Sequence, residues 1–262
     1  MFNLLPLLTS VVIGVLIYMT LFHVLSIVTK RSDIVDIAWG LGFVLISLIS
    51  LLTQEVLTDR MLIVFILVLL WGLRLSSHIF LRNIKKEEDY RYKQFKKDWG
   101  KNFYIKSYFK IFLLQGLLMI FISSPILLIS SSQFVTIGTF DYIGVSLWII
   151  GFLIETISDL QLKSFVTLKK EGKTDTRFAN IGLWKYSRHP NYFGEILQWW
   201  GIGIVALSVP FGYIGLIGPA LITYLLIFVS GIPLLEKKFE KDSEWNTYVE
   251  RTRKLIPFSK RI

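Results

Sequence analysis

Long apolar runs separated by short polar connections dominate this chain of 262 residues. A helix needs roughly 20 mostly apolar residues to cross a hydrocarbon core about 30 Å thick. The runs are continuous and do not alternate, so helices are favoured over barrel strands. The pattern therefore predicts an all-α, polytopic membrane protein of about seven transmembrane helices. The predicted helices cover residues 2–28, 34–52, 61–81, 110–130, 141–162, 191–209 and 212–232.

The first apolar run is expected to remain in the membrane as a helix. A signal peptide carries positive charge before its apolar region, whereas the first basic residue here, Lys30, follows the run. No internal repeat and no linker-like composition interrupts the rest of the chain. We therefore expect a single membrane domain over residues 1–262.

The basic residues are distributed unevenly and predict an orientation. Of 29 Lys and Arg, all but Arg60 and Arg74 fall in alternate connections and the C-terminal tail. The positive-inside rule places such segments in the cytosol, which leaves the N-terminus outside and the C-terminus cytosolic. We expect a bacterial inner membrane or an endoplasmic-reticulum-type membrane. The basic segments are residues 29–33, 82–110, 163–190 and 236–262.

Charge and composition narrow the chemistry further. The formal net charge of +10 is typical of cytosolic loops that meet anionic lipid headgroups, so nucleic acid is not an expected partner. The chain has no Cys, which excludes disulfides and thiolate catalysis, and it has only three His. A metal site is therefore not expected. The sequence gives no indication of the oligomeric state.

Ionisable residues within the predicted spans share one depth. Such groups are costly in the hydrocarbon region and are functional candidates by default. At 1.5 Å per residue, they fall in the cytosolic half of the membrane, which predicts a polar cavity open to the cytosol. Alternatively these groups only lock the bundle, for example through Arg74 with Asp36 or Glu155. The residues concerned are His23, Asp36, Arg74, His78, Glu155, Asp159 and Glu195.

Two further segments are expected near this cavity. Glu155, Asp159 and Lys163 recur every four residues and so share one face of a helix. That face is expected to line the cavity, with Lys163 at its mouth. The connection 82–110 mixes charged and aromatic residues, which is typical of an interfacial amphipathic helix, and a lid over the site is the other interpretation.

The segment from Gly182 to Glu195 carries the most specific pattern. Pro190 suits the first turn of a helix, and the N-terminus of a helix attracts anions. Arg188 and His189 add donors at the same point, which predicts an anion site suited to cofactor phosphates. Asn191, Tyr192 and Glu195 offer further polar groups. The alternative is that Arg188 and His189 only anchor the chain at the interface.

These residues resemble a known family. Ser-Arg-His-Pro-Asn-Tyr-Phe-Gly-Glu at 187–195, followed by Trp199-Trp200-Gly201, is similar to the signature of the DUF1295 proteins, which belong to the superfamily of steroid 5-alpha-reductases and sterol C14-reductases. Other segments agree, and the resemblance covers roughly residues 30–260. They are Asp36 with Trp39-Gly40, Trp71-Gly72-Leu73-Arg74-Leu75 with His78, Glu88-Asp89-Tyr90-Arg91-Tyr92, Ser158-Asp159-Leu160-Gln161, and in the tail Leu235-Glu236, Tyr248 and Arg253-Lys254-Leu255-Ile256-Pro257-Phe258.

The resemblance implies a seven-helix fold that binds NADPH in a cytosol-facing cavity, with the cofactor-binding half at about 141–262. A lipophilic substrate would enter from the bilayer. Asp159, Asn191 and Glu195 match cofactor-binding positions of the reductases. The full set of cofactor-binding candidates is Glu155, Asp159, Lys163, Tyr186, Arg188, His189, Asn191, Tyr192, Glu195 and Glu236.

The expected catalytic groups depart from the family pattern. Steroid reductases polarise the enone oxygen with a Glu on helix two and a Tyr on helix three. The corresponding helices here offer Asp36, Arg74 and His78 as catalytic candidates, and no Tyr. No Gly-x-Gly-x-x-Gly motif follows a strand, so a Rossmann domain is not indicated. Gly201-Ile202-Gly203 lies in an apolar run and predicts close helix packing.

Three function classes remain open. The leading hypothesis is an NADPH-dependent reductase of a carbon–carbon double bond in a steroid- or isoprenoid-like substrate. The second is an S-adenosylmethionine-dependent methyltransferase of a lipid or prenylated substrate. Isoprenylcysteine carboxyl methyltransferases are similar in Arg-His-Pro-x-Tyr-x-Gly and in an acidic residue corresponding to Glu236. The third is a lipid-binding or channel-like protein without a cofactor.

Overall fold

The computed structural model describes residues 4–84 and 86–257. Within these residues the secondary structure is helical and contains no strand, which confirms the all-α prediction. The expected start of the first helix at Phe2 lies outside the described residues. The chain divides into two compact units. Unit 1 comprises Met1–Asp141 and Ala206–Gly218, and unit 2 comprises Tyr142–Val205 and Pro219–Ile262. The expectation of a single domain stays a prediction.

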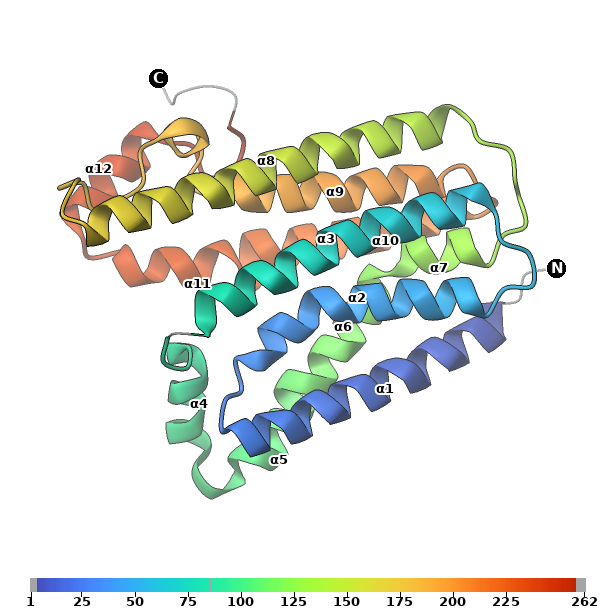
Figure 1. The fold of residues 1–262 in the computed structure, drawn as a ribbon, viewed down its shortest axis with the longest axis horizontal. Coiled ribbons are helices and arrows are strands. Elements are labelled where there is room, and N and C mark those ends of the chain that lie inside the picture. Colours follow the sequence, from blue (N-terminus) through green and yellow to red (C-terminus); the bar gives the residue numbers. More distant parts are fainter. Residues whose placement is uncertain (1–3, 85, 258–262) are drawn as a thin grey trace. The chain divides into compact units, whose positions relative to one another are not determined.

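Unit 1 begins with three long helices, α1 (Leu4–Thr29), α2 (Ile34–Leu52) and α3 (Asp59–Asn83), seen in blue to teal in Figure 1. Helices α2 and α3 approach each other closely at two glycines. A Cβ on Gly40 would lie 2.7 Å from the carbonyl oxygen of Gly72, and one on Gly72 would lie 2.6 Å from that of Gly40. Small residues at such a crossing let two backbones pack directly, which explains the Trp-Gly pairs of the sequence.

The next part of unit 1 corrects a prediction. The expected single helix at 110–130 is wrong, because the helical run starts earlier, at α4, and breaks at Ser123. Pro125 lies in the first turn of the last piece, where its missing N–H costs nothing. The pieces are α4 (Tyr90–Trp99), a 3-10 turn (Gly100–Asn102), α5 (Phe103–Ser107), a π-helical segment (Tyr108–Leu113), α6 (Leu114–Ile122) and α7 (Ser124–Ser130).

A buried ion pair closes one part of unit 1. Arg60 is only 1% exposed, and its Nε donates to Asp141 Oδ1 over 2.6 Å. The same guanidinium donates to the carbonyl oxygens of Phe134 and Thr136. The other carboxylate oxygen of Asp141 accepts from Gly138 N and Ser208 Oγ. Every part of this pair therefore has a hydrogen-bond partner.

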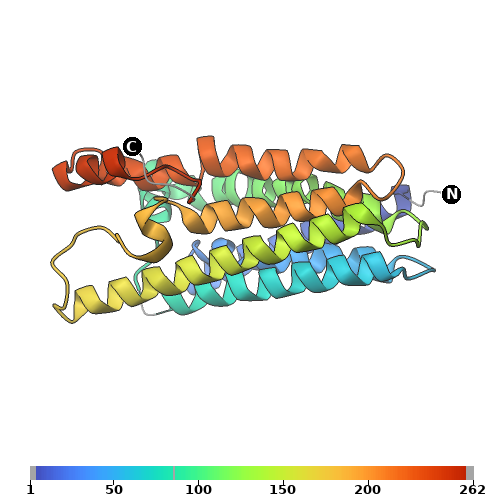
Figure 2. The same cartoon turned by 90° about the horizontal axis from the view of Figure 1, so that it is seen from above.

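Unit 2 is built on α8 (Thr139–Lys170) and α9 (Pro190–Ala206), which run side by side in Figures 1 and 2. The two helices meet at glycine pairs: Gly151 with Gly194, and Gly144 with Gly201, each with a Cβ-to-carbonyl distance of 2.5 or 2.6 Å. This confirms the close packing predicted at Gly201. Helix α8 extends eight residues beyond the predicted end at 162, so the connection predicted at 163–190 begins inside a helix.

The remaining elements are short. The predicted helix at 212–232 is divided into several pieces, and a C-terminal helix follows it. That helix, α12 (Ser243–Arg251), begins at Asp242, whose side chain accepts from the backbone N–H groups of Glu244 and Trp245. The other elements are 3-10 turns at Gly182–Lys185, Gly212–Leu216 and Lys237–Phe239, α10 (Ile217–Tyr224), a π-helical segment at Leu225–Val229 and α11 (Ile232–Glu236).

Six helical segments in the described residues are long and apolar enough to cross a membrane. The predicted span at 191–209 corresponds to α9, which has 17 residues and is not one of the six. The count of seven and the orientation therefore stay predictions. The six segments are Leu4–Thr29, Ile34–Leu52, Asp59–Asn83, Tyr90–Ile122, Thr139–Lys170 and Gly212–Phe239.

Candidate functional site

The start of α9 is tied to the C-terminal segment within unit 2. Ser187 and Arg253 form an isolated parallel bridge, in which Arg188 N donates to Arg253 O over 2.9 Å. The Ser187 hydroxyl donates to Leu255 O over 2.6 Å and accepts from His189 N over 3.1 Å. The segment that leads into α9 is therefore held by residues far along the chain, immediately before Pro190 opens the helix.

The buried Arg188 and His189 meet the partly buried Glu236 in a polar cluster beside this bridge. Arg188 Nε donates to Glu236 Oε1 over 2.9 Å, and His189 Nε2 lies 2.8 Å from the same oxygen. Arg188 Nη1 also donates to Thr252 O over 2.6 Å. Burial lowers the pKa of the His189 imidazole below its ordinary value, and the hydrogen bond to Glu236 opposes that shift. The predicted anion-binding arginine thus has an internal carboxylate partner.

An aromatic cluster packs next to these charges. Phe178, Phe239, Trp245 and Tyr248 contact one another through their rings. Tyr248 donates its hydroxyl to Trp184 O over 2.7 Å, and the indole N–H of Trp184 donates to Ser158 O of α8 over 2.9 Å. The C-terminal helix is therefore fastened both to the segment before α9 and, through it, to α8.

The polar candidates on α8 and α9 meet along the facing sides of these two helices. Asn191 Nδ2 donates to Asp159 Oδ1 over a long 3.4 Å, and Gln198 Nε2 donates to Glu155 Oε2 over 2.6 Å. Asp159 and Glu195 are buried, at 8% and 7% exposure, whereas Asn191 is half-buried. A row of carboxylates with an accessible amide at its end is an arrangement suited to binding a polar ligand.

The other candidates of unit 2 lie around this row. The Tyr192 ring stacks on His189, with centroids 5.7 Å apart and planes 12° from parallel. Tyr186 and Lys163 are exposed. Sequence reasoning missed Gln198, although a polar amide inside an apolar helix, one turn beyond the predicted Glu195, is a signal that could have found it. It also missed the backbone carbonyls at 249 and 252, which no side-chain pattern announces.

The catalytic candidates Asp36, Arg74 and His78 belong to unit 1. Asp36 Oδ1 accepts from the Tyr92 hydroxyl over 2.7 Å, and Oδ2 accepts from Arg91 Nη2 over 2.8 Å. Both of these partners come from α4, and sequence reasoning, which considered Arg74 as a partner of Asp36, did not predict them. Arg74 and His78 lie one turn apart on α3 and are half-buried.

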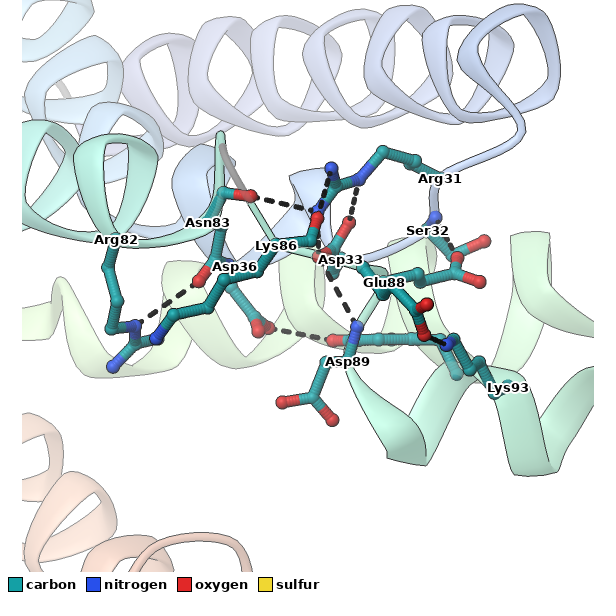
Figure 3. Close-up of polar contacts among 12 residues, drawn as sticks. Arg31, Ser32, Asp33, Asp36, Arg82, Asn83, Lys86, Glu88, Asp89 and Lys93 are labelled. Atoms are coloured by element: carbon teal, nitrogen blue, oxygen red, sulfur yellow. Dashed lines mark hydrogen bonds and ion pairs between the residues drawn. The ribbon is translucent and has the colours of Figure 1, made fainter. Parts of the chain in front are cut away.

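A second polar network fixes the connection that leads into α4 (Figure 3). Arg31 pairs with Asp33 over 2.8 Å and also donates to the carbonyls of Asn83 and Lys86. Glu88 accepts from Ser32 N over 2.6 Å and pairs with Lys96 over 2.6 Å. These contacts hold the N-terminal end of α4 against the start of α2, where Tyr92 is buried at 3% exposure.

The six apolar helical segments define an integral membrane protein built from α-helices. A family model described as a protein of unknown function, DUF1295, matches residues 22–252. The chain therefore belongs to the DUF1295 family, within the steroid 5-alpha-reductase-like superfamily.

Similar proteins fall into two groups by coverage. An uncharacterized protein of Schizosaccharomyces pombe is 25% identical over 94% of this chain and 79% of its own length. Human 3-oxo-5-alpha-steroid 4-dehydrogenase 1 is 31% identical over 44% of this chain and 40% of its own length. Very-long-chain enoyl-CoA reductase of Dictyostelium discoideum is 33% identical over 30% of this chain and 25% of its own length. The matched segments thus span less than half of these two enzymes. No solved structure matches the chain.

Proposed function

We propose that this protein is an NADPH-dependent membrane reductase that reduces a carbon–carbon double bond in a lipophilic substrate. The observation that carries the proposal is the polar row between α8 and α9, in which the accessible Asn191 is joined to the buried Asp159. The relatives named as a steroid dehydrogenase and an enoyl-CoA reductase support the reaction class. Substrate identity is left at that chemical class.

The residues of the row fit a nicotinamide nucleotide. The carboxamide of nicotinamide carries both donors and an acceptor, and the Asn191 amide offers the complementary set. The carboxylates of Asp159 and Glu195 can accept hydrogen bonds from ribose hydroxyls. Lys163 and Tyr186 are exposed and are proposed to contact the phosphates. Glu155, which accepts from Gln198, is proposed to hold α9 in register against α8.

Arg188 is proposed as a positioning residue. Its guanidinium is 93% buried and donates to Glu236 and to two backbone carbonyls. A guanidinium committed to these partners holds the C-terminal segment against the start of α9. His189 shares Glu236 and stacks on Tyr192, so the cluster orients the aromatic ring next to Asn191. We propose that Arg188, His189, Tyr192 and Glu236 shape the cofactor site in this way.

When bound, NADPH supplies a hydride to the β-carbon of an alkene conjugated with a carbonyl group. The negative charge that develops on the carbonyl oxygen requires a hydrogen-bond donor or a cation. We propose the catalytic candidates Arg74 and His78 for this role. Both oxygens of Asp36 are engaged by Arg91 and Tyr92, so we propose a supporting role for it and not that of proton donor.

An apolar groove supports a lipophilic ligand. It lies in unit 2, has a volume of about 420 Å³ and is lined mainly by aliphatic side chains of α8. Ligand sites of this size are typical for small molecules, and apolar lining favours apolar ligands. We propose that the groove contacts the hydrocarbon part of the substrate. Its lining includes Ile150, Leu153, Ile154, Ile157, Gln161 and Leu183.

The test is ligand-induced stabilisation of the protein purified in detergent. NADPH and S-adenosylmethionine are titrated separately while the melting temperature is measured, since a ligand that binds only the folded state raises it. We expect a rise with NADPH, and about a tenfold weaker response in Asn191→Ala, which removes hydrogen bonds to the ligand. Glu195→Ala should act in the same direction.

Matched controls come from exposed residues of α12. Asn246→Ala and Glu244→Ala change the same residue types at exposed positions of the same unit and should leave the NADPH response unchanged. A response to S-adenosylmethionine alone would overturn the reductase in favour of the methyltransferase. If neither ligand changes the melting temperature of protein that melts cooperatively, a lipid-binding protein without cofactor would be favoured.

A further inference from the structure

A groove in unit 1 lies between α1 and the chain around the π-helical segment. It has a volume of about 370 Å³, and all of its lining residues belong to unit 1. A π-helical turn inside an α-helix is rare and frequently marks a functional site. Both walls belong to helical segments apolar enough to cross a membrane. The lining includes Thr20, His23, Ile27, Tyr104, Tyr108 and Phe109.

One polar atom at this groove lacks a partner within the described part of the chain. His23 is 91% buried, and its Nδ1 is fully enclosed but makes no hydrogen bond to any described residue. Its ring is wedged between Tyr108 and Phe112, with both centroid distances at 5.0 Å. A buried polar atom without a partner costs about 1–3 kcal/mol, so its presence at a ligand-sized groove calls for a bound group.

The hydroxyl groups of Thr20 and Tyr108 beside His23 determine which hydrogen-bond donors and acceptors the bound group needs. Thr20 donates its only hydroxyl hydrogen to Leu16 O over 2.7 Å. The 3.0 Å contact between Thr20 Oγ1 and Tyr108 Oη must then use the tyrosine hydrogen. Tyr108 Oη is left as an acceptor, while His23 Nδ1 is a donor or an acceptor according to its tautomer. A hydroxyl group, which both donates and accepts, satisfies the two sites together.

We infer that this groove binds an uncharged lipid through a single hydroxyl group, with the hydrocarbon part against Ile27, Tyr104 and Phe109. A carbonyl group can accept from His23 but cannot donate to Tyr108. A charged headgroup would be costly at a wall made of apolar membrane-spanning segments. The inference is independent of the proposed reductase, because none of the contacts that carry it involves a residue assigned to the reductase site.

The test uses ultraviolet crosslinking of purified protein in detergent micelles, without NADPH. The probes are a long-chain alcohol and a 3-hydroxysterol, each carrying a diazirine, and the methyl ether of each probe. We expect the alcohol-type probes to label peptides containing residues 20–27 or 104–109. The ethers, which cannot donate to Tyr108, should label about fivefold less. Comparison of the two hydroxyl probes tells an acyl-chain ligand from a sterol.

Two substitutions remove the polar contacts while keeping the packing. His23→Phe retains a ring between Tyr108 and Phe112. Tyr108→Phe keeps the ring and removes the hydroxyl, which is the proposed acceptor and also donates to Thr20. Each should reduce labelling by the hydroxyl probes about fivefold to tenfold. Thr29→Val is the control, because Thr29 also lies on α1 and donates to the carbonyl four residues earlier but is not among the residues that line the groove. It should leave labelling unchanged.

Several outcomes would overturn the inference. They are equal labelling by alcohol and ether, labelling of other peptides, and labelling unchanged in both ring variants. If His23→Phe does not give a cooperative melting transition, Tyr108→Phe carries the test. Loss of NADPH binding with intact probe labelling would reject the reductase alone, and the reverse would reject the lipid site alone.

Discussion

Two buried arginines invite comparison, Arg60 in unit 1 and Arg188 in unit 2. Both are almost fully buried, at 1% and 7% exposure, and each donates to one carboxylate and to two backbone carbonyls. Sequence reasoning treats them differently. Arg188 belongs to the signature motif and is a cofactor-binding candidate, whereas Arg60 lies outside the basic segments and is not a candidate. Burial and pairing do not separate them.

The two arginines differ in the surroundings of their carboxylate partners. Asp141 is 3% exposed and accepts from Gly138 and Ser208 in addition to Arg60. The Glu236 side chain is 21% exposed, and its Oε1 is shared by Arg188 and His189. The neighbouring Asn191 and Tyr192 are half-buried. A saturated, closed ion pair serves the fold, whereas one bordered by accessible polar groups can also position a ligand.

The largest expected effect is a loss of stability when the closed pair, Arg60 with Asp141, is broken. Arg60→Met leaves the Asp141 carboxylate buried without its cation and should destabilise the protein by about 3–5 kcal/mol. Thermal unfolding in detergent measures the loss, and the affinity for NADPH of the remaining folded protein should not change. The double variant Arg60→Met with Asp141→Leu should recover part of the stability. A single variant as stable as the wild type would show that the pair contributes nothing.

A smaller loss of stability, accompanied by weaker NADPH binding, is expected at the pair of Arg188 with Glu236, which we call the open pair. Arg188→Lys keeps the charge but loses the planar fork that reaches both Glu236 and the carbonyls. We expect a destabilisation of about 1.5–3 kcal/mol together with weaker NADPH binding, measured by titration of the melting temperature. If stability falls while NADPH affinity is retained, the two arginines are equivalent and the proposed positioning role is wrong.

The free energy of unfolding should depend on pH through His189, which shares Glu236 with Arg188 in the open pair. Burial lowers the pKa of His189, so the unfolded chain takes up this proton first, at about pH 6.5. The stabilising contribution is complete above that pH and is lost as pH falls, with a slope of at most about 1.4 kcal/mol per pH unit. Melting curves between pH 7.5 and about pH 5.5 test this, with His189→Gln as the comparison. A variant with the same pH dependence as the wild type would contradict the assignment.

The smallest effect is expected at Asp36. Tyr92→Phe removes one donor to this carboxylate and leaves Arg91 in place, which should cost about 1 kcal/mol. The melting temperature measures it, and Tyr142→Phe, at a tyrosine that is 69% exposed, is the control. A reductase assay on the same variant asks whether the network supports turnover, and unchanged activity would confine Tyr92 to a structural role.

Sequence reasoning was most successful for features that depend on residues close together in the chain. Continuous apolar runs predicted helices, and the glycines at 201 and 203 predicted close helix packing without identifying α8 as the partner. It missed the break before Pro125, a local signal inside a continuous apolar run, and the extension of α8 to Lys170 through polar residues. The partners of Arg188 lie 48 to 64 residues away, and those of Asp36 lie 55 and 56 residues away. No periodicity encodes such pairings.

The bridge between Ser187 and Arg253 also sets an order for maturation. The carbonyl of Thr252 is synthesised 64 residues after Arg188, so this hydrogen bond at the entrance to α9 can form only after the chain has reached residue 252. A translation product stopped before residue 249 would retain the whole signature motif and yet lack the carbonyls that hold it.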